Sequence, residues 1–453
     1  MKSIKITALA MAVLMVMALA AGCATTPAVS EEPAAPAAEE PSSEAPGMSG
    51  NIKVLTHRTD RMEDGSLEEM TKAFTDKYGI TVEYQGFTDY ATEVPTVMQA
   101  GNYGDVLMTP QSVKQAELPQ FFAELGDAAT ISEKYMWTED FTTDGKVYAL
   151  PHAGTASGIM YNKQVWADAG ITALPTSTDE FLACLKQIAE NTEAIPYYTN
   201  YAAGWTITQW QSLIVSCAGD PDYTNNCVTG DFDLFEEGGP YDLVYGMLYN
   251  IYADPSLTEE DHSTTDWEGC KPAFGEGKIG AMVMGSWAIA QFQETAADPA
   301  VVGYMPFPNQ VGGKQYAQTA HDYGISANKD STNMDAAIAY VTWFVDESGF
   351  AQKEGMLSAV KGAAMPDTLS AFEELGVELF SETPAPEKYV GVYDKIAKEL
   401  STVDPWGDAS DNFKFKLAEK AFAGEGDAGY KEVADAATAA WNEARTAALA
   451  EIG

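Results

Sequence analysis

A regular alternation of strand-like and helix-like segments, beginning near residue 52, constrains the fold of this chain most. Short apolar runs typical of strands occupy residues 52–56, 80–84 and 106–108. Between the first two runs, apolar side chains recur at helical spacing until Gly79, a typical helix stop. Strands that alternate with helices predict a parallel sheet in an α/β layer, whose ligands bind beyond the carboxyl ends of the strands. The candidate site residues at these strand ends are His57, Arg58, Asp60, Asp89, Tyr90 and Thr109.

The same alternation resumes after residue 161. Further strands are expected at residues 195–198, 279–284 and 323–327, and helices at 179–190, 334–346, 412–422 and 430–449. Residues 205–215 are expected to form a helical, aromatic segment. Polar and aromatic side chains that follow strand ends, or stand in turns, add candidates to the site. They are Asn200, Tyr201, Trp205, Trp210, Trp287, Asp322 and Trp406.

Residues 144–170, with the sequence DGKVYALPHAGTASGIMYNKQVWADAG, carry no catalytic or phosphate-binding signature. A first short strand ends at Pro151, because proline cannot donate to a strand ladder. The small residues 154–158 predict a turn, and a second strand then leads into a helix. His152 and Thr155 of this stretch are candidate site residues.

Length and charge restrict the classes of partner. A chain of 453 residues is expected to form two or three domains. Its formal net charge of −41 argues against nucleic acid and anionic membrane surfaces, because both require clustered Lys and Arg. A strongly acidic surface also keeps an extracellular protein soluble.

The first 22 residues have the features of a secretion signal. Lys2 and Lys5 precede an uncharged apolar run at residues 6–19, which is short for a membrane span of about 20 residues. The run ends in LAAGC, which resembles a bacterial lipobox with alanine where leucine is usual. This resemblance implies lipidation of Cys23; ordinary secretion, with cleavage after a small residue, is the alternative. Residues 23–50 then comprise the lipidated cysteine and a disordered spacer rich in Ala, Pro, Glu and Ser.

The four remaining cysteines permit disulfides in an exported chain. Cys217 and Cys227 flank a turn-rich loop and are the preferred pair, which leaves Cys184 with Cys270 by elimination. Metal binding by cysteine is less favoured because no CxxC spacing is present.

The loop at residues 220–226 (DPDYTNN) has side chains of the kind that bind calcium, but an Asx-rich turn explains the sequence better.

Seven sequence pieces, in order, resemble the bacterial extracellular solute-binding proteins, the sugar-binding family that feeds ABC importers. They are FTDKYGITVEY, GNYGDVLM, GKVYALP with GIMYNKQVWADAGI, FGEGKIGAMVMGSW, VGYMPFP, YGISANK and GAAMPD. The resemblance implies a periplasmic-binding-protein-like α/β fold of type II, with two lobes joined by a hinge and a ligand cleft between them. The chain would cross between lobes near residues 153–157, 319–324 and 361–365. Lobe 1 would comprise residues 51–154 plus 322–362, and lobe 2 residues 155–321 plus 363–453.

The resemblance also gives roles to several candidates. Trp287, in the family's GSW motif, is expected to stack on a sugar, and Trp406 resembles a late aromatic of the second lobe. Trp205 and Trp210 occupy the position of cleft aromatics, but their spacing suggests that one of them is a core residue. Trp267 is expected to pack beneath a helix start, with Thr265 or Asp266 as the cap.

The polar candidates have simpler interpretations. His57, His152 and His321 fall in predicted site loops, where neutral hydrogen bonding to hydroxyl groups fits better than zinc, since no pair has the i, i+4 spacing. Asp60, Asp89 and Asp322 could accept hydrogen bonds from sugar hydroxyls. Arg58 is explained either by a ligand contact or by pairing with an aspartate.

These observations predict a monomeric, lipid-anchored extracytoplasmic receptor that delivers a carbohydrate, and an oligosaccharide in particular, to ABC permease subunits. An oligosaccharide site of this kind is expected to present three or more aromatic side chains. The receptor is expected to have no catalytic residues, cofactor or metal. The alternatives are a secreted glycoside hydrolase, which needs two carboxylates about 5–10 Å apart, and a surface protein that binds glycans without transport.

Overall fold

The computed structural model describes residues 50–452 except 231–232, 400–402, 405–406 and 408. These described residues belong to one compact unit, Ala45–Gly453. The predicted signal, Cys23, the spacer up to residue 49, and Trp406 therefore lie outside the described residues, whereas Gly50, the last predicted spacer residue, opens strand β1. Within the described part of the chain, no helix combines the length and the apolar character needed to cross a membrane.

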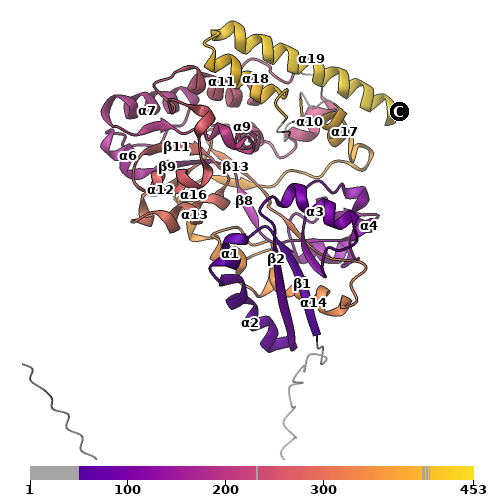
Figure 1. The fold of residues 1–453 in the computed structure, drawn as a ribbon. Coiled ribbons are helices and arrows are strands. Elements are labelled where there is room, and N and C mark those ends of the chain that lie inside the picture. The colour runs from indigo at the N-terminus through magenta and orange to yellow at the C-terminus, as the bar shows by residue number, and fades with distance from the viewer. Residues whose placement is uncertain (1–49, 231–232, 400–402, 405–406, 408, 453) are drawn as a thin grey trace, which may run out of the picture. The chain divides into compact units, whose positions relative to one another are not determined.

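The first sheet has five strands in the order β2-β1-β3-β14-β7. Figure 1 shows β1 and β2 of this sheet side by side. Its strands are β1 (Gly50–Thr56), β2 (Ile80–Gly86), β3 (Val106–Thr109), β7 (Leu150–Pro151) and β14 (Gly324–Ala327). β1 pairs in parallel with β2 and β3, which confirms the parallel sheet predicted from residues 52–108. β14 enters antiparallel between β3 and β7, so a segment distant in sequence completes this sheet.

Helices cover this sheet and form what we call the first core. They are α1 (Thr59–Glu63), α2 (Ser66–Tyr78), α3 (Tyr90–Gln99), α4 (Leu118–Phe121), α5 (Ala128–Lys134), α14 (Met334–Asp346) and α15 (Phe350–Lys353). Val54, Phe74, Val106 and Tyr340 are fully buried in the first core. Gly79 ends α2 in the left-handed conformation, as the sequence predicted.

The second sheet has four strands in the order β10-β11-β9-β12. Its strands are β9 (Ile159–Asn162), β10 (Ile195–Tyr197), β11 (Ile279–Val283) and β12 (Val302–Met305). Helices around it are α6 (Lys163–Asp168), α7 (Thr178–Asn191), α8 (Trp205–Thr208), α9 (Ser212–Ala218), α10 (Tyr223–Thr229), α11 (Pro240–Ala253), α12 (Trp267–Gly275), α13 (Ile289–Thr295), α16 (Ser370–Leu375), α17 (Val392–Glu399), α18 (Phe413–Phe422) and α19 (Gly426–Ile452).

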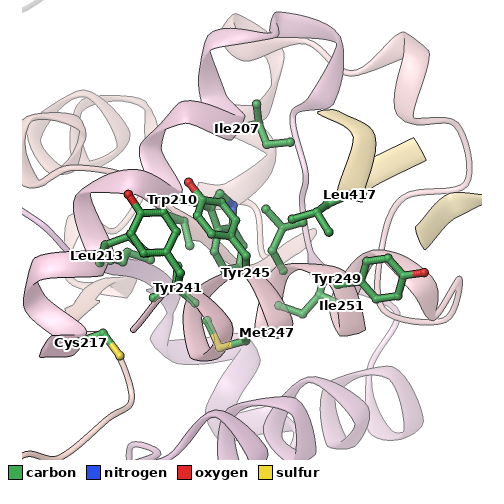
Figure 2. Close-up of a cluster of buried hydrophobic side chains, with 14 of the residues drawn as sticks. Ile207, Trp210, Leu213, Cys217, Tyr241, Tyr245, Met247, Tyr249, Ile251 and Leu417 are labelled. Atoms are coloured by element: carbon green, nitrogen blue, oxygen red, sulfur yellow. The ribbon is translucent and has the colours of Figure 1, made fainter. Parts of the chain in front are cut away.

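Two more cores surround the second sheet. The second core includes Trp210, Tyr245 and Leu417, whose side chains gather between helices in Figure 2. The third core includes Met160, Phe274 and Tyr304. The helical segment expected at residues 205–215 is broken: α8 and α9 are separated by a 3₁₀ turn.

Smaller sheets and single turns of 3₁₀ helix complete the fold. The crossing sheet, as we call it, has the order β15-β13-β8 and consists of β8 (Gly154–Ala156), β13 (Tyr316–His321) and β15 (Glu378–Phe380). A further small sheet holds β4 (Gly126–Asp127), β5 (Thr142–Thr143) and β6 (Lys146–Val147). The 3₁₀ turns are Gln115–Glu117, Glu139–Phe141, Tyr201–Ala203, Gln209–Gln211, His262–Thr264, Ser286–Ala288, Pro299–Val301, Asp367–Leu369 and Glu387–Tyr389.

The small residues after His152 form strand β8, so the predicted turn is wrong at residues 154–156. β8 runs antiparallel to β13, and Gly154 also bridges to Leu357. In Figure 1, β8 and β13 lie between the strands β1 and β2 and the strands β9 and β11. The predicted strand end at Pro151 is confirmed, because β7 ends at this residue, which pairs with Gly324.

The expected disulfides are contradicted, because Cys184, Cys217, Cys227 and Cys270 are all free thiols in the structure. Cys184 packs against the second core whereas Cys270 lies in the third, so these two cannot meet. Cys217 and Cys227 stand on separate helices, α9 and α10, as apolar side chains of the second core. Burial raises the pKa of both thiols to about 12, which keeps them protonated and unreactive.

Candidate ligand-binding site

Four aromatic rings meet where the strands of the first sheet end. His57 follows β1 and stacks on Tyr323 with ring centroids 4.5 Å apart. The rings of Tyr90 and His152 stand edge-on to the His57 ring, with centroids 5.8 Å and 6.4 Å from its centroid. Sequence reasoning had selected His57, Tyr90 and His152 but missed Tyr323, whose only signal is its place between candidate Asp322 and the glycine that opens β14.

Two nitrogens of this ring cluster are available as hydrogen-bond partners. His57 Nδ1 and His152 Nε2 are buried and have no hydrogen-bond partner among the described residues. His152 Nδ1 lies 2.9 Å from the Tyr323 carbonyl oxygen, so that nitrogen carries the proton and Nε2 is an acceptor. Burial lowers the pKa of both histidines to about 3, so the rings are neutral at physiological pH.

Asp322 stands beside these rings. Its Oδ2 lies 3.6 Å from His152 Nε2, and its side chain is 24% exposed. Burial raises the pKa of the Asp322 carboxyl to about 6, against the opposing charges of His321 and Arg58. His321 itself faces Asp140, with Nε2 and Oδ2 3.0 Å apart. Burial favours the neutral His321 ring, but the hydrogen bond and charge of Asp140 raise its pKa overall.

Arg58 and Asp60 belong to an ion-pair cluster. Arg58 donates to both Asp60 carboxylate oxygens at 2.9 and 2.7 Å, which is the aspartate pairing that the sequence left open. Arg58 Nη1 also lies 2.7 Å from Glu354 Oε2. Arg61 donates to the same Glu354 carboxylate at 2.9 Å and to Glu294 at 2.6 Å. These pairs occupy most donors of Arg58, a buried residue with 8% exposure.

Three half-buried tryptophans face one another on the second-sheet side of the crossing. Trp205, Trp267 and Trp287 have ring centroids 5.1, 5.7 and 5.9 Å apart, and we call them the tryptophan trio. Trp287 also packs against Ala153 and Met356. Thr155 Oγ1 accepts from the Trp287 backbone N–H at 3.4 Å and lies 3.1 Å from Ser286 Oγ, which ties β8 to the GSW motif.

Trp267 joins the candidate site through its ring contacts, whereas its sequence context predicts packing alone. Asp266 does cap α12, as predicted, by accepting from the N–H groups of Glu268 and Gly269. The ring that follows the cap joins the trio and also contacts Phe292. The sequence TTDW indicates that Thr265 or Asp266 caps the helix, but it does not indicate in which direction the Trp267 ring points.

Several candidates are structural residues in this arrangement. Trp210 is 1% exposed, packs against Tyr197 and lies in the second core (Figure 2), so its ring offers no face to a ligand. It is the core member of the Trp205 and Trp210 pair. Thr109, 4% exposed, bonds to the Ser326 hydroxyl at 2.7 Å. Tyr201 is half-buried against Phe415 and Phe422, away from the trio rings.

Asn200 and Asp89 stand in contrasting surroundings. Asn200 is fully buried in the left-handed conformation (φ 50°), and neither polar atom of its side chain has a hydrogen-bond partner among the described residues. A buried amide of this kind requires a partner, such as water or a ligand group. Asp89 is exposed before α3 and makes no side-chain capping bond.

Two depressions lie away from the ring cluster and the tryptophan trio. One, of about 510 Å³, is lined by Asp220, Asn225, Asn226, Thr383 and Tyr389, among others, and by none of the predicted site residues. Asp220 there accepts from the Asp222 backbone N–H at 2.9 Å, which confirms the predicted Asx turn. The other, of about 150 Å³, lies beside Arg61, Glu294 and Glu354. Among the described residues, no group of three His, Cys, Asp or Glu side chains could hold a metal ion.

Two α/β sheets, joined by a crossing sheet with aromatic and polar side chains gathered beside it, define the class of two-lobed solute-binding proteins. A family model described as bacterial extracellular solute-binding protein matches residues 59–349. The chain belongs to this family, as the seven sequence pieces implied, and its fold is that of the type II members.

Individual relatives are bacterial binding proteins. The chain is 24% identical to the multiple sugar-binding protein of Streptococcus mutans, over 66% of this chain and 73% of the relative. It is 25% identical to the diacetylchitobiose binding protein DasA of Streptomyces coelicolor, over 68% of this chain and 69% of the relative. A solved manno-oligosaccharide-specific solute-binding protein of Bifidobacterium animalis subsp. lactis, in complex with mannotriose, is 31% identical. That likeness covers 88% of this chain and 95% of the other, with a TM-score of 0.81.

Proposed function

We propose that this chain is the carbohydrate receptor of an ABC importer, with manno-oligosaccharides as its ligand class. The observation that carries the proposal is the tryptophan trio beside the crossing sheet, since sugars present apolar faces that stack on aromatic rings. The mannotriose-bound relative at 31% identity supports the choice of ligand class. The neutral His57 and His152 nitrogens and the Asp322 carboxylate add acceptors for sugar hydroxyls.

The receptor works by closure of two lobes and has no chemistry of its own. Lobe 1 is formed by residues 51–154 plus 322–362, and lobe 2 by residues 155–321 plus 363–453. The separation of the first and second cores supports this division. The pairing of β8 with β13 supports the first two crossings, and the third is proposed near residues 361–365. A ligand bound between the lobes stabilises their closed arrangement, which is what the permease subunits recognise.

The protein is anchored outside the cytoplasm through a lipid on Cys23. Membership of an extracellular family supports the location, and the LAAGC sequence supports the anchor. Metabolic labelling with a palmitate analogue tests this directly. The wild-type chain is expected to carry the label in the membrane fraction and Cys23→Ala to lose it, whereas equal labelling of both would contradict the anchor.

The ligand class is tested by intrinsic tryptophan fluorescence against a panel of sugars. Mannobiose, mannotriose, maltotriose, raffinose and diacetylchitobiose are titrated into the purified chain, with the polyamine spermidine as a non-sugar comparison. We expect saturable changes with the manno-oligosaccharides at the lowest concentrations. Binding of spermidine alone, or release of monosaccharide from any oligosaccharide, would contradict the proposal.

A further inference from the structure

Trp137 lies across the crossing sheet in a conformation that costs energy. It follows α5, within the proposed lobe 1, and has a positive φ of 56°. Residues with a Cβ rarely adopt this left-handed region, and such outliers persist only where the surrounding structure holds them. The side chain is 9% exposed and belongs to the third core together with Ala156, Leu357 and Ala359. Those three residues lie in or beside the crossings.

The Trp137 ring rests directly on the first crossing. A Cβ placed on Gly154 would approach its Cη2 and Cζ3 atoms to 2.2 and 2.3 Å, so the ring occupies the space above that glycine. Gly154 is also the residue at which the crossings meet, because it pairs with His321 of β13 and bridges to Leu357. The preceding residue, Met136, donates its N–H to the Ala359 carbonyl at 2.8 Å.

A hydrogen bond links the indole to the far edge of the crossing sheet. Trp137 Nε1 donates to Ser381 Oγ at 2.8 Å. Ser381 follows β15, and its hydroxyl lies 3.0 Å from Thr319 Oγ1 on β13. Trp137 therefore comes from the proposed lobe 1, covers the first crossing and is bonded to a residue of the proposed lobe 2.

We propose that Trp137 is a positioning residue of the hinge, one that sets the angle between the lobes through Gly154 and Ser381. This inference rests on the proposed hinge-closing function and deepens it. The Trp137 ring is held at one edge by a hydrogen bond and packs on a glycine, which has no side chain to displace. These contacts pre-organise the crossing strands. A receptor with ordered crossings loses less conformational freedom when it closes on a ligand, and it therefore binds that ligand more tightly.

The test compares Ser381→Ala and Trp137→Phe with Trp441→Phe as a matched control. Trp441 is also a buried indole, 1% exposed, whose Nε1 donates to the Cys227 carbonyl, but it lies in the second core away from the crossing sheet. For each protein the Kd for mannotriose, the ligand-free radius of gyration from small-angle X-ray scattering, and the melting temperature are measured. Ser381→Ala removes the acceptor of the indole bond together with the hydroxyl contact to Thr319, but no apolar packing, so the protein is expected to stay folded.

We expect both hinge variants to raise the Kd three- to tenfold and to change the ligand-free radius of gyration. Trp441→Phe is expected to lower the melting temperature while leaving Kd and radius at the wild-type values. Unchanged Kd and radius in folded Ser381→Ala and Trp137→Phe would overturn the hinge role. If the wild-type chain binds no carbohydrate, the proposed function fails separately, and the ligand-free radius alone then decides the role of Trp137.

Discussion

At the scale of single residues, Trp287 connects the tryptophan trio to the crossing. Its ring contacts Trp205 and Trp267 and also packs against Ala153 and Met356, and the side chain remains half-buried. Its backbone N–H is bonded to Thr155 of β8. A sugar stacked on this ring would therefore contact the second lobe and lie against the crossing at the same time.

Replacement of Trp287 by alanine is expected to weaken mannotriose binding at least tenfold, or about 1.4 kcal/mol, because the stacking surface is lost. Trp287→Phe keeps an aromatic face and should lose less affinity than the alanine variant. Calorimetric titration of both variants measures the difference. An alanine variant with wild-type affinity would remove Trp287 from the site.

Asp322 is expected to make ligand binding depend on pH. Because burial raises its pKa to about 6, the carboxyl is mostly ionised at pH 7.5 and mostly protonated at pH 5. A charged acceptor forms stronger hydrogen bonds than a neutral one, so the Kd for mannotriose should rise three- to tenfold as the pH falls across this range. The neighbouring His57 and His152 titrate near pH 3 and stay neutral throughout.

Asp322→Asn is the control for this dependence. The asparagine cannot ionise, so its Kd should vary little between pH 7.5 and pH 5 in the same buffers. A variant that retains the full pH dependence would assign it to a different group, and the raised pKa of His321 beside Asp140 makes that histidine the next residue to test.

Sequence patterns predicted that several candidate residues lie together but did not separate their roles. His57 does lie beside Tyr90 and His152, because strand ends meet at one edge of a sheet. The choice between Trp205 and Trp210 could not be made, because a spacing of five residues does not tell which ring faces the core. Tyr323 and Trp267 were missed because their positions follow from pairing between distant segments.

At the scale of secondary-structure elements, local patterns predicted the long helices and the parallel strands, but not the crossing strand β8. Small residues such as Gly154 and Gly158 usually indicate a turn. In the folded chain they are small because rings cover them: a Cβ would meet Trp137 at Gly154 and Tyr304 at Gly158. Those rings come from distant segments, so the strand has no local signature.

Asn162 shows how one side chain joins two elements. It caps α6 by accepting from the N–H groups of Gln164 and Val165, and its amide donates to the Phe274 carbonyl at 2.6 Å. Asn162→Ala should lower the free energy of unfolding by about 2–3 kcal/mol, because a cap is lost and the Phe274 carbonyl keeps the Gly277 N–H but loses the Asn162 amide as a donor. Denaturant unfolding measures this loss.

Ser177→Ala provides the matched comparison. The Ser177 side chain caps α7 through one hydrogen bond from the Glu180 N–H and, among the described residues, makes no second hydrogen bond to another element. Its expected cost is about 1 kcal/mol. Equal losses for the two variants would show that the link from α6 to the end of α12 contributes nothing beyond the cap.

At the scale of the whole molecule, charges reinforce the attachment of segments such as α1, whose apolar packing is limited to the partly buried Met62. Helix α1 has no buried residue, yet its Arg61 reaches Glu354 and Glu294, which are distant in sequence. Glu354 is only 8% exposed at its side chain and accepts from both Arg58 and Arg61. In a chain of net charge −41, these few cations are placed against specific carboxylates.

Glu354→Gln is expected to lower the free energy of unfolding by about 3 kcal/mol, because it leaves the buried Arg58 guanidinium without one of its charge partners. Glu294→Gln is the matched control: that carboxylate pairs with Arg61 but is 51% exposed, so its loss should cost less than about 1 kcal/mol. Unfolding by urea, an uncharged denaturant, is measured at low and at high salt to distinguish the two variants. Equal effects of the two substitutions would contradict the importance of burial.

We propose above all that the chain is a receptor that binds a carbohydrate without transforming it. The most direct test is calorimetric titration of the wild-type protein with mannotriose. The sugar is then recovered from the calorimeter cell and identified. We expect saturable binding of one mannotriose per chain and recovery of the intact trisaccharide. Absence of a binding signal, or recovery of mannose and mannobiose, would contradict it.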